Sequence, residues 1–253
     1  MLKKNWIIIL YLILTPNLLG AWEVNTGMGV EYFGFKLKVV DKDNNYYTTL
    51  IKSTLGTATV SLAQSDWKII LDGGWSDWNV SGSWEGNSIE KFSPEPFYWL
   101  DQYKYSIAGS WSFTSWLEGR VKFSEHNVMH YPSTIDLIYL QYYMRTAEIM
   151  LNCLVLPKKN FNVYLSAIYS PWSYINIYQY TYLPASVPGI HEYSFESTGQ
   201  HLGLGIEAQY YNKNNWGLVF KYNLEEYFFL DVPSFSDFSF RSGKIKLEFL
   251  FKF

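Results

Sequence analysis

The sequence predicts an all-β protein, folded as a single antiparallel β-barrel of about ten strands, and three observations support this prediction. Several segments alternate strictly between apolar and polar residues, which is the period of a strand rather than of a helix. After the N-terminal region the chain has no run of about 18 apolar residues that would span a membrane as a helix. Aromatic residues make up 20% of the chain, a density typical of the two interface girdles of a membrane barrel.

The N-terminal region has the pattern of a secretory signal peptide. Two lysines at positions 3–4 precede an unbroken apolar run over residues 6–14, and small residues follow up to Ala21. The apolar run is too short to cross a membrane comfortably as a helix, which needs about 20 residues. We therefore expect residues 1–21 to be a cleaved signal peptide and residues 22–253 to form one barrel domain.

Alternation is cleanest in the middle and at the end of the chain. In residues 102–113, Tyr103, Tyr105 and Ile107 share one face, and Lys104 and Ser106 share the other. Comparable patterns and β-branched or aromatic content predict ten strands. These strands cover roughly residues 22–40, 46–63, 67–78, 102–113, 117–130, 135–156, 160–178, 198–211, 216–231 and 238–253.

Two of the predicted strands change phase part of the way along. Residues 22–40 do so near Tyr32-Phe33, and residues 135–156 do so between Arg145 and Ala147. Either a β-bulge or the passage of the strand out of the lipid band explains such a change.

The predicted connections differ between the two ends of the barrel. Those after even-numbered strands are short and polar, whereas those after odd-numbered strands include two long segments, 79–101 and 179–197. Short periplasmic turns and longer extracellular loops are typical of outer-membrane barrels. An even strand count places both termini on the periplasmic side. Eight strands are the alternative, if a weak hairpin belongs to a loop.

The last nine residues resemble the C-terminal signal of bacterial outer-membrane β-barrels. Every odd position from 245 to 253 is a large apolar residue, and three of the four even positions are charged. The resemblance identifies Phe249, Phe251 and Phe253 as a barrel-assembly signal. It implies residence in the bacterial cell outer membrane, with outer-membrane lipid and the barrel-assembly machinery as partners.

Charge and cysteine content narrow the classes of function. Without residues 1–21 the chain has 18 basic and 23 acidic residues, and this acidic balance argues against nucleic acid as a partner. The single Cys153 cannot form an internal disulfide. Charged residues nevertheless populate the predicted inner face, and in so narrow a lumen we expect them to pair and fill it; a narrow channel is the alternative. They are Lys104, Glu118, Arg120, Lys122, Glu207, Lys221, Glu225, Lys244, Lys246 and Glu248.

Candidate chemistry lies at the predicted outer mouth. Asp72 and Asp77 fall at the top of the third strand and in the second outer loop, and His191 and Glu192 fall in the fourth outer loop. In a ten-strand ring, strands three and eight face each other across the mouth. A carboxylate on one side and a histidine on the other are able to activate a water molecule for hydrolysis.

This arrangement resembles that of the omptins, ten-stranded outer-membrane proteases. The resemblance matches Asp77-Trp78 to the family's Asp-Trp pair and His191 to its catalytic histidine. The family's two other acids fall on Trp75 and Gly189 here, so Asp72 and Glu192 are the candidate substitutes. It also implies that lipopolysaccharide is a possible requirement for activity.

We expect a non-enzymatic protein with a structural or surface-interaction role, acting on an extracellular ligand through the loops at 79–101 and 179–197. An omptin-like endopeptidase is the alternative and a narrow pore the third possibility. The sequence predicts neither a metal site nor a bound cofactor.

Overall fold

A computed structural model describes residues 22–41, 46–76, 81–86, 89–92, 100–130, 138–181, 192–213, 215–229 and 235–253. Asp77, His191 and the predicted signal peptide, residues 1–21, lie outside this description. The described chain consists of strands joined by turns. These strands are β1 (Glu23–Asp41), β2 (Tyr46–Gln64), β3 (Trp67–Ser76), β4 (Ser81–Gly86), β5 (Ile89–Phe92), β6 (Leu100–Thr114), β7 (Leu117–His130), β8 (Ile138–Lys158), β9 (Phe161–Thr181), β10 (Glu192–Tyr211), β11 (Trp216–Phe229) and β12 (Phe235–Lys252).

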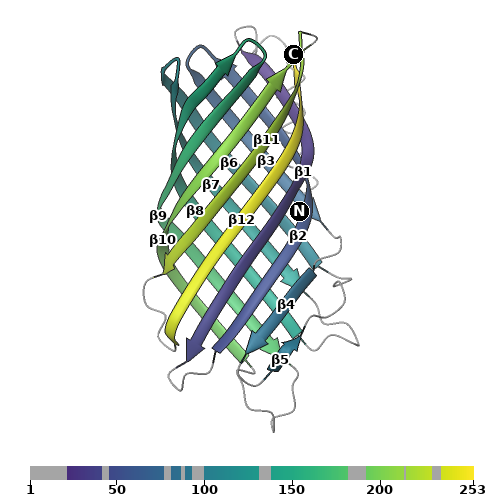
Figure 1. Cartoon of the computed structure of the whole chain (residues 1–253), viewed down its shortest axis with the longest axis vertical. Coiled ribbons are helices and arrows are strands. Elements are labelled where there is room, and N and C mark those ends of the chain that lie inside the picture. The colour runs from purple at the N-terminus through teal and green to yellow at the C-terminus, as the bar shows by residue number, and fades with distance from the viewer. Residues whose placement is uncertain are drawn as a thin grey trace.

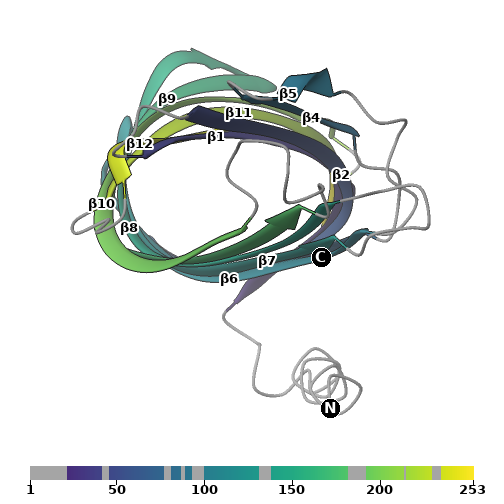
Figure 2. The same ribbon diagram turned by 90° about the horizontal axis from the view of Figure 1, so that it is seen from below.

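Ten of these strands form a closed antiparallel barrel. The ring runs β1-β2-β3-β6-β7-β8-β9-β10-β11-β12, and β1 closes it by pairing with both β2 and β12. Seen along its axis, the barrel is an oval ring of strands (Figure 2). The all-β prediction is confirmed, and the strand count is ten rather than eight.

The two ends of the barrel differ as predicted. The turns at 65–66, 115–116, 159–160 and 212–215 lie at one end, together with the C-terminus, at the top of Figure 1. Two of these turns hold a non-glycine residue in the left-handed region, Ser65 (φ 54°) and Asn215 (φ 62°). Asparagine tolerates this region better than most residues do. The strands β4 and β5 lie at the opposite end (Figure 1).

Two predicted boundaries at this opposite end are wrong. The segment 79–101 was expected to be a loop, but it contains β4, which pairs with Tyr47–Lys52 of β2. Because β3 pairs with β2 only up to Gly56, β4 satisfies backbone groups of β2 that β3 leaves unpaired. The eighth barrel strand was expected to begin at residue 198, but β10 begins at Glu192.

The polarity of the barrel wall inverts part of the way along β1. On β1, Met28, Val30 and Tyr32 are exposed on the outer face. Beyond Tyr32 the buried, inward-facing residues become apolar, beginning with Phe33, and the outward-facing ones become polar, beginning with Lys36. The pairing of β1 with β2 and β12 keeps its register through this point. The phase change in the sequence is therefore the exit from the lipid band and not a bulge.

The outer apolar band has the height of a membrane. It covers nine residues on β10, Leu202–Tyr210, and nine on β12, Ile245–Phe253, and a spanning strand needs about 9–11 residues. The outward residues of β10 above it, such as Thr198 and Gln200, are polar and exposed. The ten residues from Glu192 to His201 extend the wall beyond the band, on the side away from the short turns. This extension is roughly 25 Å long, given about 3.3 Å per residue and a tilt near 40°.

Aromatic side chains mark both edges of this band, as the composition predicted. Trp67 and Trp116 are exposed at the edge beside the short turns. Tyr105, Tyr169 and Trp172 are exposed near the opposite edge of the band. Tryptophan and tyrosine favour such interfaces because they combine an apolar ring with a polar group.

The second phase change, between Arg145 and Ala147, coincides with a β-bulge in the neighbouring strand. Arg145, Ala147 and Ile149 of β8 all face outward, so β8 itself keeps its alternation. The partner strand β9 has one extra residue here, since Ala147 pairs with Trp172 and Ile149 with Tyr169. This bulge turns both Ser170 and Ser173 into the interior, where both are buried.

Candidate functional site

Paired charges line the membrane-level interior of the barrel. All ten charged residues predicted to face inward do so and make ion pairs, so the pairing prediction is confirmed. The pairs are Lys104–Glu31 (2.6 Å), Arg120–Glu118 (2.8 Å), Lys122–Glu148 (2.7 Å), Lys221–Glu207 (3.0 Å), Lys244–Glu225 (2.7 Å), Lys246–Asp72 (3.0 Å) and Lys246–Glu248 (3.5 Å).

Several of these pairs join strands that are not neighbours. Lys104 of β6 donates to both carboxylate oxygens of Glu31 on β1, at 2.8 and 2.6 Å, although the two strands are three places apart in the ring. Lys246 of β12 similarly contacts Asp72 of β3. Charges removed from water need partners of opposite sign, and these pairs satisfy them across the lumen.

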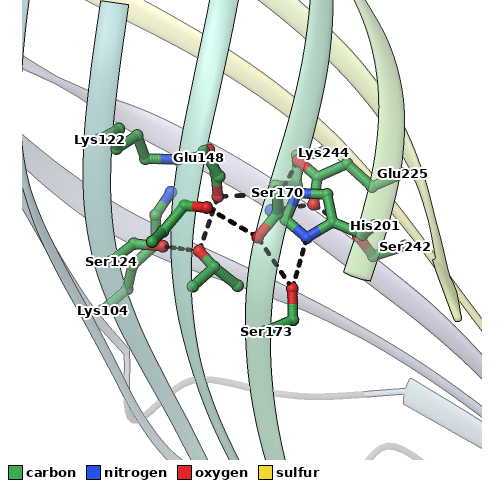
Figure 3. Close-up of polar contacts among 12 residues, drawn as sticks. Lys104, Lys122, Ser124, Glu148, Ser170, Ser173, His201, Glu225, Ser242 and Lys244 are labelled. Carbon is green, nitrogen blue, oxygen red and sulfur yellow. Dashed lines mark hydrogen bonds and ion pairs between the residues drawn. The ribbon is translucent and has the colours of Figure 1, made fainter. Parts of the chain in front are cut away.

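A histidine and two serines extend this network (Figure 3). The hydroxyl of Ser173 lies 2.9 Å from Nδ1 of His201, and Nε2 of His201 lies 4.0 Å from Glu148. The order serine, histidine, acid is that of a nucleophilic triad. However, Glu148 already accepts from Lys122 and Thr146, and Ser173 and His201 are 0% exposed. No substrate reaches them, so this cluster is polar packing.

Above the charged level, aromatic side chains close the lumen. The ring of Phe35 on β1 stacks on that of Tyr142 on β8, with centroids 5.1 Å apart. These strands are five places apart in the ring of ten, which is the widest separation available. Phe240 of β12 stacks on both rings, at 5.5 and 5.6 Å, and Tyr227 of β11 meets Phe240 edge-on at 4.9 Å. Contact between opposite walls therefore blocks the centre of the lumen at this level.

The residues proposed for hydrolysis are not assembled by the described structure. Asp72 was expected at the outer mouth, but β3 continues to Ser76 and Asp72 faces the lumen. Its Oδ1 accepts from Lys246 at 3.0 Å and from Thr59 at 3.3 Å. Glu192 is the first residue of β10, where its backbone pairs opposite Tyr180. The ring does place β3 and β10 five strands apart, as predicted.

Three lumen acids were missed by sequence reasoning. Asp72 precedes Gly73-Gly74, a pair that favours a loop, and yet both glycines pair with β2. Asp72 lies at alternate positions with Lys68 and Ile70 on one strand, so all three side chains share a face. This spacing would have placed Asp72 inside the barrel. Glu31 and Glu148 lie next to the two phase changes, and their facing therefore stayed undetermined.

Of the comparisons with known proteins, the one with solved structures bears on the fold. No protein-family model and no curated protein matches the chain. Among solved structures, the outer membrane protease OmpT from Escherichia coli is similar with a TM-score of 0.59 and 9% identity, covering 92% of this chain and 96% of that one. Ail of Yersinia pestis is matched over 91% of this chain and 98% of its own at 9% identity, with a TM-score of 0.42. The chain therefore has the fold of a ten-stranded outer-membrane β-barrel.

Proposed function

We propose that this protein is a closed, non-conducting barrel that acts at the cell surface through a structural or surface-interaction role. The observation that supports this proposal is the inverted polarity of the wall beyond the apolar band. Over that height the outer face becomes polar and the interior becomes richer in apolar side chains, with Phe33, Phe35 and Leu37 buried beside the polar Gln102 and His126. This is the pattern of a sheet surrounded by water.

The part of the barrel that extends beyond the apolar band, away from the short turns, has the properties of a rigid support. The ladders of β1 with β12 and of β8 with β9 continue through it, and Phe35, Tyr142 and Phe240 pack across its interior. A support of this kind holds the ends of β9 and β10, at Thr181 and Glu192, away from the lipid surface. Binding residues in many proteins lie on loops that a rigid scaffold positions.

Two measurements on the refolded protein in lipid nanodiscs and planar bilayers test this proposal. We expect no ion conductance, and we expect binding to at least one member of a panel of extracellular-matrix proteins and glycans. Replacing residues 182–191 by a short Gly-Ser turn should abolish that binding while the barrel stays folded. Steady single-channel conductance would contradict the proposal, as would binding that survives shortening of this connection and of 79–101.

An omptin-like endopeptidase is the second candidate, and the similarity to OmpT supports it at the level of fold. The experiment is cleavage of a mixed peptide library containing paired basic residues, with and without lipopolysaccharide. Cleavage that is lost in both Asp77→Asn and His191→Ala would favour the peptidase over a binding role. Because Asp72 is held by Lys246 inside the barrel, we expect Asp72→Asn to act through stability rather than through chemistry.

A further inference from the structure

The lumen contains a chamber at the short-turn end. A cavity of about 430 Å³ is lined by turn residues Asn212 and Asn215 and reaches inward to Arg120 and Lys221. A smaller cavity of about 130 Å³ shares Lys68, Arg120, Glu207 and Gln209 with it. The stacked Phe35 and Tyr142 close the lumen further along, so this chamber is open only toward the short turns. In an outer-membrane barrel that side faces the periplasm.

The charges at the inner wall of this chamber are unevenly paired. Four cations line the chamber: Lys68 of β3, Arg120 of β7 and Lys221 of β11 at its inner wall, and Lys252 of β12 at its mouth. Glu118 pairs with Arg120 at 2.8 Å and Glu207 pairs with Lys221 at 3.0 Å. Within the described part of the chain, the ammonium group of Lys68 makes neither a hydrogen bond nor an ion pair; Arg120 and Lys221 repel it, and Glu207 and Glu118 attract it from a distance.

The carboxylates nearby are already engaged by other groups. Glu207 accepts from Gln209 as well as from Lys221, and Glu118 also accepts from Asn152 at 2.9 Å. Glu248, on another wall of the chamber, forms an ion pair with Lys246 at 3.5 Å, although its buried Oε1 accepts no hydrogen bond. At the mouth, Glu23 pairs with Lys252 at 2.7 Å. None of these acids neutralises Lys68 by direct contact.

One hydrogen-bond donor of Arg120 has no acceptor. Its Nη2 bonds Glu118 at 2.8 Å, while its buried Nε–H has no hydrogen-bond acceptor. A buried donor without an acceptor is unfavourable, and a small rotation of the guanidinium group would offer it to a ligand in the chamber. A guanidinium fork that lines the same cavity as two ammonium groups offers the kind of donors and charge that bind a phosphate group.

We propose that Lys68, Arg120 and Lys221 form a binding site for a phosphate-class oxyanion that enters from the periplasmic side. The closed aromatic level above the chamber means that the anion is held rather than conducted. A singly charged carboxylate offers fewer acceptor oxygens to the three cations and is therefore the poorer ligand. This site is independent of any binding at the outer end of the barrel.

Calorimetric titration of the refolded, detergent-solubilised full barrel with inorganic phosphate tests the proposal, at ionic strength held constant with NaCl. Lys68→Gln is the informative variant, because Lys68 has no hydrogen bond to lose from the fold. Lys68→Arg retains the charge, and Lys213→Gln removes an exposed cation from the turn at the same end. Folding of each variant is checked by the different migration of boiled and unboiled samples.

We expect saturable phosphate binding that Lys68→Gln weakens by about tenfold or more, while Lys68→Arg stays within about threefold of the parent. Lys213→Gln should bind like the parent. Absence of saturable binding by the folded parent would overturn the site. Equal weakening by Lys68→Gln and Lys213→Gln would reduce it to general surface attraction, and displacement by acetate at equal concentration would show that the ligand class is wrong.

Discussion

Phe35 and Tyr142 stack across the whole width of the barrel, with ring centroids 5.1 Å apart on strands that are five places apart in the ring. Both side chains are almost completely buried, at 1% and 0% exposure. Neighbouring strands are held together by their backbone ladders, but opposite walls meet only through side chains. This contact therefore both closes the lumen and braces the part of the barrel that projects beyond the lipid.

Truncation of this contact should open the barrel. We expect Tyr142→Ala to lower the free energy of unfolding by about 3–5 kcal/mol, as for other large aromatic residues removed from a core. It should also produce measurable ion conductance in planar bilayers, because a void replaces the ring. The control is Phe123→Ala, whose ring is 56% exposed on the lipid-facing side, and which should leave the bilayer non-conducting. Conductance that is unchanged in Tyr142→Ala would show that the closure lies elsewhere.

The pair formed by Lys104 and Glu31 should couple strongly. Their side chains are 11% and 4% exposed, so Glu31→Gln leaves an unpartnered ammonium group in the lumen. We expect a loss of about 3–5 kcal/mol in urea unfolding, and a double variant with Lys104→Met that loses less than the sum of the single changes. Additive losses would contradict the coupling.

The pair of Glu23 and Lys252 provides the matched control for that experiment. These side chains are 43% and 48% exposed, and an exposed pair is worth about 0–1 kcal/mol. We therefore expect Glu23→Gln to change the unfolding free energy by no more than that amount.

Cysteine labelling on intact cells should locate the water boundary on β10. In a Cys153→Ser background, Thr198→Cys should react with a membrane-impermeant maleimide, because Thr198 is exposed above the apolar band. Ile206→Cys lies within the band and should stay unlabelled, as should Lys213→Cys on the short-turn side. Reaction of Lys213→Cys in sealed cells would mean that the barrel has the opposite orientation.

Loss of the terminal aromatic residue should affect assembly more than stability. Phe253 is 78% exposed, and its backbone N–H donates to Val24 at 2.8 Å, a bond that any residue preserves. We expect Phe253→Ala to reduce the heat-modifiable, assembled fraction in cells several-fold. The purified variant, refolded in detergent, should unfold within about 1 kcal/mol of the parent. A large loss of stability in the refolded variant would show that Phe253 acts through packing.

Much of the barrel was predictable because the lipid band imposes one rule on every strand. Alternation along the strand is enough to place Ile107 and Leu204 on the outer face. It also places Lys104 and Glu207 on the inner face. Beyond the band the rule reverses, so Phe33 and Phe35 gave a pattern opposite to that of Tyr32 and Val30 without any change in the backbone. Sequence alternation cannot separate such a reversal from a bulge, because both shift the pattern by one residue.

The candidate site was less predictable, because side-chain contacts across the lumen depend on the stagger of the strands. The pairing of Lys104 with Glu31 joins residues 73 positions apart in the chain, and no local spacing indicates it. The general expectation that the inner charges pair was correct, since buried charges have few other ways to be stabilised. The partner of each charge was not determined by the sequence.

The reversal of polarity along the wall also fixes the hydrophobic thickness that this protein accepts. A thicker bilayer would bring the exposed Lys36, and the outward ion pair of Arg241 with Glu226, into hydrocarbon. Near the bilayer midplane an outward Lys or Arg costs about 2–4 kcal/mol, falling toward zero at the interfaces. The lipid is easier to deform than the closed barrel, so the bilayer should thin locally around the protein. The same mismatch would favour sorting of this barrel into the thinner regions of its membrane.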